Sequence, residues 1–170
     1  MGWENFTNDD LTVMNDATWS ARRIYWQVGF DLFGFFTYSI PLAQAQGYAY
    51  VDQDSEAEWL TSQWSIPNDG IDVFLVKGYA GPTAGLSPVT GPCDKNLAWP
   101  SMTGAVVEMA GPATNVGLAH EIGHYLGLAH DNDPNNLMYP SVDSGGPVAD
   151  PRLTFGQGAQ IAQHCFTRLP

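Results

Sequence analysis

Three of the four histidines in this 170-residue chain fall within a stretch of eleven residues. His120 and His124 are four residues apart, a spacing that places both side chains on one face of a helix, close enough to share a metal ion. Glu121 follows the first of them and would lie beside the ion rather than on it. The pattern predicts a metal site with a carboxylate next to it.

A third ligand, His130, requires the helix to end before it. Six residues beyond His124, a continued helix would carry His130 about 9 Å along its axis and turn it away from the ion. Gly127 lies between the two histidines. Glycine adopts a positive φ readily, so this residue can end the helix and turn the chain back. We therefore expect His120, His124 and His130 to bind one ion.

Three neutral imidazoles without a thiolate suit Zn²⁺, and three protein ligands leave a fourth position for water, as in catalytic zinc sites. Zinc lowers the pKa of its water towards about 7, so that Glu121 can accept a proton and the hydroxide can attack a carbonyl carbon. Glu121 would then pass the proton to the departing amine. The alternatives are a structural zinc site and a degenerate enzyme that keeps its metal. The retained Glu121 argues against the second.

The histidine motif and the residues after it resemble the metzincin clan of zinc metallopeptidases. In that clan a long zinc motif is followed by a tight turn bearing methionine, and here the sequence Leu-Met-Tyr-Pro occupies 137–140. By resemblance, Met138 packs beneath the histidines and is not a ligand. The Met-Tyr-Pro sequence is similar to matrixins, whereas Asp131, directly after the third histidine, is similar to adamalysins. Pro140 stands where astacins and serralysins carry a tyrosine ligand, so such a ligand is not supported.

The specific resemblance covers about residues 117–142 and implies an α+β metzincin-like peptidase domain. This domain would have a mixed sheet, a long backing helix, an active-site helix and a loop-rich C-terminal subdomain that ends in a helix. We expect a single catalytic domain over 1–170, with subdomains of about 1–127 and 128–170. The resemblance also implies that 104–108 form the sheet edge that pairs with an extended substrate.

The same resemblance places a substrate pocket after the scissile bond, between the active-site helix and the segment that follows the methionine. The residues expected there are mainly apolar, namely Leu118, Tyr139, Pro140 and Val142. No lysine or arginine occurs between Lys95 and Arg152. Burying an unpaired carboxylate is costly, whereas a large apolar side chain gains on burial. We therefore expect cleavage before large apolar residues.

The remaining elements are read from hydrophobic spacing and capping residues. Apolar residues three and four apart predict a long amphipathic helix over 8–28. A capping box of Ser55 and Glu58 predicts a helix through residue 64, and one of Thr154 and Gln157 predicts a terminal helix whose apolar stripe reaches residue 169. Aromatic and β-branched residues predict strands over 30–40, 71–76 and 104–109.

Charge and composition exclude several classes of protein. Six Lys and Arg against 18 Asp and Glu leave a formal charge of −12, which disfavours binding to nucleic acid or anionic lipid. The longest uncharged stretch, 32–51, contains too many polar residues for a membrane span. The N-terminus lacks the basic and then apolar order of a signal peptide. We expect a mature, secreted, monomeric domain that acts on peptide or protein substrates.

The two cysteines, Cys93 and Cys165, can form one disulfide that ties a loop rich in glycine and proline to the terminal helix. The alternative is two buried thiols. Cys93 lies within the domain and lacks the surroundings of a pro-segment cysteine that would occupy the zinc. The fourth histidine, His164, stands alone near a helix end and is expected to be non-catalytic.

Two clusters of oxygen-bearing side chains raise the question of calcium. One is Asp131, Asp133, Asn135 and Asn136, and the other is Asp52, Asp54, Glu56 and Glu58. Neither has the glycine and the spaced ligands of a calcium loop, so we interpret both as helix caps and solvated turns. Because many matrixins bind calcium, Ca²⁺ stays open as a second ion.

The leading hypothesis is a zinc-dependent endopeptidase that hydrolyses peptide bonds with a zinc-bound water assisted by Glu121. Two hypotheses from other classes stay open. One is a zinc-containing binding module without turnover, and the other is a zinc amidohydrolase that acts on non-peptide amides.

Overall fold

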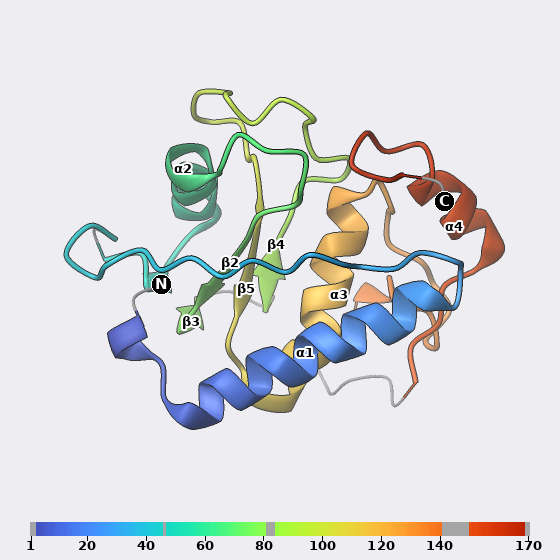
Figure 1. Cartoon of the computed structure of the whole chain (residues 1–170), viewed down its shortest axis with the longest axis horizontal. Coiled ribbons are helices and arrows are strands. Elements are labelled where there is room, and N and C mark those ends of the chain that lie inside the picture. Colours follow the sequence, from blue (N-terminus) through green and yellow to red (C-terminus); the bar gives the residue numbers. More distant parts are fainter. Residues whose placement is uncertain (1–2, 46, 81–83, 141–149, 169–170) are drawn as a thin grey trace.

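The computed structural model describes residues 3–45, 47–80, 84–140 and 150–168, which form an α+β fold, as predicted (Figure 1). In chain order the elements are η1 (Trp3–Asn5), α1 (Asn8–Trp26), β1 (Tyr50–Val51), α2 (Asp54–Trp64), β2 (Val73–Val76), β3 (Gly78–Tyr79), β4 (Gly85–Leu86), β5 (Ala105–Glu108), η2 (Gly111–Ala113), α3 (Thr114–Tyr125) and α4 (Phe155–Ile161). Figure 1 shows α2 and α4 on opposite sides of the molecule, with α1 crossing below.

The larger sheet has three strands in the order β2-β5-β4. β2 runs parallel to β5, and β4 runs antiparallel to β5. The strands predicted over 71–76 and 104–109 are confirmed as β2 and β5. The prediction that 104–108 form the sheet edge is wrong, because β4, a two-residue strand, pairs with the far side of β5. The two edge strands of this sheet are therefore β2 and β4.

The strand predicted over 30–40 is absent, and this segment instead runs back along α1 without a regular structure (Figure 1). An ion pair between Arg22 and Asp31, 2.9 Å apart, ties the segment to α1. Phe33 is 77% exposed and Phe36 is 80% exposed. Aromatic residues favour a strand where a sheet partly buries them, and this segment pairs with none of the described strands.

The long helix predicted over 8–28 is confirmed as α1, and it packs against α3, the helix that carries the histidines. Ala17 and Ala21 lie on its buried face, where small side chains let the two helices approach closely. The buried hydroxyl of Tyr25 donates a hydrogen bond of 2.9 Å to the carbonyl of Ala119 on α3. Among the described residues, no helix has the length and apolar character to cross a membrane.

The predicted helix over 55–64 is present as α2, but it begins at Asp54 and the capping box of Ser55 and Glu58 does not form. The N-cap is Gln53, whose side chain makes no capping hydrogen bond. Instead, the carboxylate of Glu56 accepts a hydrogen bond from the backbone N–H of Asp52. The N-cap is thus two residues earlier than the Ser55 that the sequence pattern indicated.

The terminal helix is present as α4, and its capping box of Thr154 and Gln157 is confirmed. The helix ends at Ile161, earlier than predicted. Beyond it, Cys165 is bonded to Cys93 and the ring of His164 contacts the carbonyl of Gly91, so the chain is held against another loop and cannot continue the helix. Residue 169 lies outside the described residues.

The N-terminus of α1 generates a prediction on stability. Asp10 completes a capping box with Thr7 and accepts hydrogen bonds from Lys77 at 2.9 and 2.8 Å. The bonds from Lys77, and then those from Thr7, lower the pKa of Asp10 from 3.8 to about 2. A carboxyl group whose pKa falls on folding stabilises the fold above its unfolded pKa, and this contribution is lost as the pH falls through the folded pKa.

We therefore expect Asp10→Asn to lower the melting temperature at neutral pH, and the difference from wild type to shrink as the pH falls from 3.8 to about 2. Thermal unfolding followed by circular dichroism measures this difference. Asp9→Asn, in the same first turn but exposed, is the matched control and should have a smaller effect. A penalty for Asp10→Asn that does not change with pH would contradict the prediction.

Candidate metal centre

The helix α3 ends where the spacing of the histidines requires it to end. Gly127 has φ of +100°, and its N–H donates to the carbonyl of His124 at 2.9 Å. The N–H of Leu128 donates to the carbonyl of Gly123 at 2.9 Å. This pair of bonds is the Schellman motif, which closes a helix through a residue in the left-handed conformation. The predicted role of Gly127 is therefore confirmed.

The turn brings the three predicted ligands together. One ring nitrogen from each of His120, His124 and His130 lies within 4.8 Å of the corresponding atom of the other two. The Nε2 atoms of His124 and His130 are 3.2 Å apart. His120 and His124 are buried and His130 is exposed, so the cluster opens to solvent on one side. Within the described residues, no other cluster of His, Cys, Asp or Glu could hold a metal ion.

Backbone carbonyls orient two of the three rings. The Nδ1 atom of His120 lies 2.7 Å from the carbonyl oxygen of Leu137, and that of His124 lies 2.8 Å from the carbonyl oxygen of Leu128. A carbonyl oxygen only accepts hydrogen bonds, so each Nδ1 carries the proton and each Nε2 presents a lone pair. This is the outer hydrogen bond that orients metal-binding histidines. The donor set therefore fits zinc, since imidazole nitrogen is a preferred zinc ligand.

Burial also favours the form of His120 that binds metal. The side chain is almost fully enclosed, and this burial lowers its pKa below the usual 6.5. The hydrogen bond to Leu137 acts in the opposite direction, and the nearby His130 lowers the pKa further. Because only the neutral imidazole has a lone pair for a metal, the environment keeps His120 ready to bind.

Met138 is fully buried against α3. A Cβ atom added to Gly123, which lies between the two helical ligands, would come within 2.6 Å of the Met138 sulfur. The turn that carries Met138 is closed by a hydrogen bond from its N–H to Asn136 and by one from the N–H of Asp131 to its carbonyl. The methionine turn thus packs directly under the zinc-binding segment of α3.

Glu121 and the histidines line a cavity of about 360 Å³. Its walls are formed by Gly85, Leu86, Ser87, Val89, His120, Glu121, His124, Ala129 and His130. Glu121 is 5% exposed, and its carboxylate borders Gly85 of the edge strand β4. A carboxylate, three imidazoles and a strand edge therefore meet at one opening.

Sequence reasoning missed the wall of the cavity that comes from 85–89. This segment has only two residues of strand and lies among glycines and prolines, so it carries no alternating pattern. The only apolar residues in this segment that could have indicated a strand are Leu86 and Val89, and two such residues are too few to distinguish a strand from a loop. The pairing with β5 identifies it.

The predicted substrate pocket is only partly described. Leu118 is 6% exposed and belongs to the main core cluster, and it does not line the cavity. Tyr139 is half-buried and Pro140 is exposed, directly after the methionine turn. Val142 lies outside the described residues. The pocket after the scissile bond stays a prediction.

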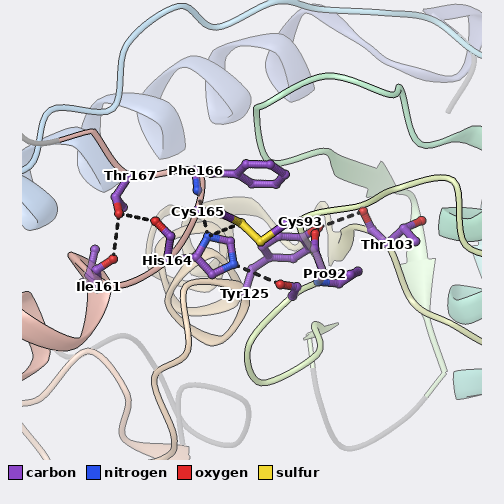
Figure 2. The surroundings of a disulfide bond; sticks show 10 residues. Pro92, Cys93, Thr103, Tyr125, Ile161, His164, Cys165, Phe166 and Thr167 are labelled. Carbon is purple, nitrogen blue, oxygen red and sulfur yellow. Dashed lines mark hydrogen bonds between the residues drawn. A yellow bond between two sulfur atoms is a disulfide. The ribbon is translucent and has the colours of Figure 1, made fainter.

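The predicted disulfide between Cys93 and Cys165 is confirmed, so the alternative of two thiols is wrong. Figure 2 shows it beside the rings of Tyr125 and His164. The ring of His164 contacts the carbonyl oxygen of Gly91 at 3.0 Å and accepts from the N–H of Phe166, in agreement with a structural role.

The loop held by this disulfide closes the end of α3. The N–H groups of Thr90 and Gly91 donate to the carbonyls of His124 and Tyr125, at 2.9 and 2.7 Å. The hydroxyl of Tyr125 in turn donates to the carbonyl of Pro92 at 2.9 Å, within the same loop (Figure 2). The disulfide therefore supports a loop whose neighbouring residues form one wall of the cavity.

The two clusters of oxygen-bearing side chains are used within turns and helix ends. Asp131 accepts from the N–H of Asp133, and Asp133 accepts from the N–H of Asn135. In the other cluster, Asp54 accepts from the hydroxyl of Tyr79 at 2.7 Å. These contacts agree with the interpretation as caps and turns. Calcium binding stays a prediction.

Comparison with known proteins agrees with this site. Residues 21–152 match the model of the metallopeptidase family M12B, reprolysin-like. Human disintegrin and metalloproteinase domain-containing protein 33 is 34% identical over 105 residues, which are 58% of this chain and 12% of that protein. Human matrilysin is 54% identical over 28 residues, which are 16% of this chain and 10% of matrilysin. The chain thus matches only a small part of each relative.

Because the family model covers most of the chain, this protein belongs to the reprolysin-like metallopeptidase family, and the predicted metzincin resemblance is confirmed.

The geometry predicts one zinc ion per chain, with a ligand from each of the three histidines. Metal analysis should find it, and His130→Ala should lose most of the zinc while keeping its helical content, because His130 is exposed and packs little. His164→Gln, which changes the histidine outside the cluster, is the control and should keep the zinc. Acidification to about pH 3 should release the metal, since protonated imidazole has no lone pair. Zinc retained in full by His130→Ala would contradict the assignment.

Proposed function

We propose that this chain is a zinc-dependent endopeptidase whose single catalytic domain has its cleft between subdomains of about 1–127 and 128–170. The observation that carries the proposal is the meeting of three imidazole nitrogens, the carboxylate of Glu121 and the edge strand β4 at one cavity. A peptide in extended form can add to such an edge as a further strand. Main-chain pairing of this kind accepts many sequences.

His120, His124 and His130 would hold the zinc, and zinc when bound acts as a Lewis acid that polarises a carbonyl group and lowers the pKa of water. Glu121 is near these ligands and borders the cavity. Its carboxylate would accept a proton from the attacking water and donate that proton to the nitrogen of the departing amine. The C–N bond breaks, and one new carboxylate and one new amine leave the cleft.

Secretion and partners are part of the same proposal. A disulfide bond persists in oxidising compartments, and both of its cysteines are exposed in this protein. The formal charge of −12 supports a protein or peptide substrate rather than nucleic acid. We propose a secreted monomer that acts on polypeptides.

Glu121→Ala should lower peptide hydrolysis by at least about 10²-fold, the lower end for loss of a general base. Zinc content should stay at one ion, because Glu121 is not a ligand. Initial rates on an unstructured peptide, with metal analysis of the same samples, measure both quantities. Glu58→Gln, which changes a carboxylate on α2, is the control and should retain the wild-type rate.

The same experiment distinguishes the other hypotheses. A binding module would retain its zinc but show no hydrolysis of any peptide, even as the wild type. An amidohydrolase that acts on non-peptide amides would cleave a small acylated amine and leave unstructured peptides intact. Near-full activity of Glu121→Ala would mean that another group activates the water.

We further propose that cleavage occurs before Leu, Ile, Met, Phe or Tyr. No lysine or arginine occurs between Lys95 and Arg152, the stretch that contains the proposed pocket residues, so an acidic side chain would find no basic side chain from this stretch. A buried apolar side chain gains about 1.5 to 3 kcal/mol, whereas a buried carboxylate without a partner costs several. Cleavage of a peptide library, followed by mass spectrometry, should show these residues enriched after the scissile bond.

A charge placed in the proposed pocket tests its position. Tyr139→Lys should increase the acceptance of Asp and Glu after the scissile bond, because the ammonium group can pair with a carboxylate. Phe155→Lys adds the same charge on α4, at a position that is 90% exposed, and should leave the profile unchanged. Preference for acidic residues in the wild type would show that the pocket is assigned wrongly.

A further inference from the structure

Gly85, the first residue of the edge strand β4, lies against the side chain of Glu121. It forms a register pair with Val107 of β5 and lines the cavity with the three histidines. Its φ is outside the left-handed region, so any residue could adopt this backbone conformation. If glycine is required at position 85, the reason is therefore that the surrounding atoms leave no room for a side chain.

The space around Gly85 is smaller than a methyl group. A Cβ atom built on it would lie 2.7 Å from the carbonyl oxygen of Val106, 2.9 Å from Cγ of Glu121 and 3.1 Å from Oε1 of Glu121. Contacts below 3.0 Å are not sustained by real Cβ atoms, so a side chain at this position would displace one of its neighbours. One of those neighbours is the carboxylate assigned to proton transfer.

Strand pairing and hydrogen bonds hold the surroundings of Gly85 in place. Val106 is fully buried, and it belongs to β5, which is paired on both sides, with β2 and with β4. Glu121 is on α3, where its neighbours His120 and His124 are bound to the carbonyls of Leu137 and Leu128. The Cγ atom of Glu121 is only two bonds from the helix backbone, so it can leave its place only through a rotation about Cα–Cβ. That rotation would relieve the contacts with Glu121, whereas the contact with the Val106 carbonyl would be relieved only by a shift of β4 relative to β5.

We propose that Gly85 is a positioning residue for Glu121, because its missing side chain leaves the volume in which the carboxylate lies beside the metal ligands. The inference rests on the proposed peptidase function for its catalytic consequence, whereas the steric part is independent of activity. With alanine at position 85, Glu121 would rotate away from the position in which it can accept a proton from water, or the edge strand that aligns the substrate would move.

The test is a double-mutant cycle of Gly85→Ala and Glu121→Ala in the full chain loaded with zinc. Glu121→Ala removes both contacting atoms of the glutamate. Gly85→Ala alone should therefore lower the melting temperature, and it should lower it less when Glu121 is already alanine. This readout needs no hydrolysis, so it stands even if the wild type cleaves no peptide, a result that would overturn the proposed function alone.

Kinetics test the catalytic part. Gly85→Ala should lower kcat by about 10²-fold, with a smaller change in KM and with zinc content unchanged, as expected for a displaced catalytic group. The matched control is Gly117→Ala on α3, where an added Cβ would meet only a Val107 methyl at 4.0 Å. This variant should keep the wild-type kcat and a melting temperature at or above that of the wild type.

Two results would overturn the proposal. The first is additivity, in which the double variant loses the sum of the melting-temperature changes of the two single variants. The methyl group added at position 85 would then not be in contact with Glu121. The second is a wild-type kcat in Gly85→Ala. If Gly85→Ala does not fold, the folding of the double variant, Gly85→Ala with Glu121→Ala, tests the proposal. A folded double variant supports the steric coupling, and an unfolded one assigns the constraint to Val106 and rejects the proposal.

Discussion

His124 and His130 can bind the same metal ion only if the backbone reverses between them, and Gly127 is where it does so. The reversal has a second consequence, because the carbonyl of Leu128, in the reversed segment, is also the acceptor for Nδ1 of His124. One turn thus both delivers the third ligand and orients the second. A residue with a Cβ atom at position 127 would strain this turn, since φ is +100° there.

The segment after the third histidine also supports the metal ligands. Leu137 orients His120 through its carbonyl, and the next residue, Met138, packs under α3 at Gly123. Asn136 exchanges hydrogen bonds with Gln157, the residue that also caps α4. The terminal helix is therefore connected to the methionine turn by polar side chains, and through that turn to the first zinc ligand.

The substrate side of the cleft depends on contacts that are distant in sequence. The edge strand β4 is positioned by β5, and the loop after it is held by a disulfide that spans 72 residues. That loop donates two backbone hydrogen bonds to the last turn of α3. In the proposed peptidase, these contacts therefore fix the position of the strand that aligns a substrate relative to the helix that holds the metal.

The sequence alone determined the features that arise from short-range geometry. The metal ligands His120 and His124 follow from the four-residue spacing on a helix, the turn follows from Gly127, and α1 follows from its apolar face. Each of these depends on atoms within a few residues of one another, so their pattern is visible in the chain.

Only the tertiary structure decided which strand lies at the edge and which aromatic residues are buried. Strand pairing joins residues that are far apart in sequence, so the central position of β5 and the edge position of β4 leave no local pattern. The same holds for Phe33 and Phe36, whose composition predicts a strand although no partner strand is available to them. The close approach of Gly85 to Glu121 is likewise a contact between two distant segments, and a single glycine in a loop-rich sequence does not reveal it.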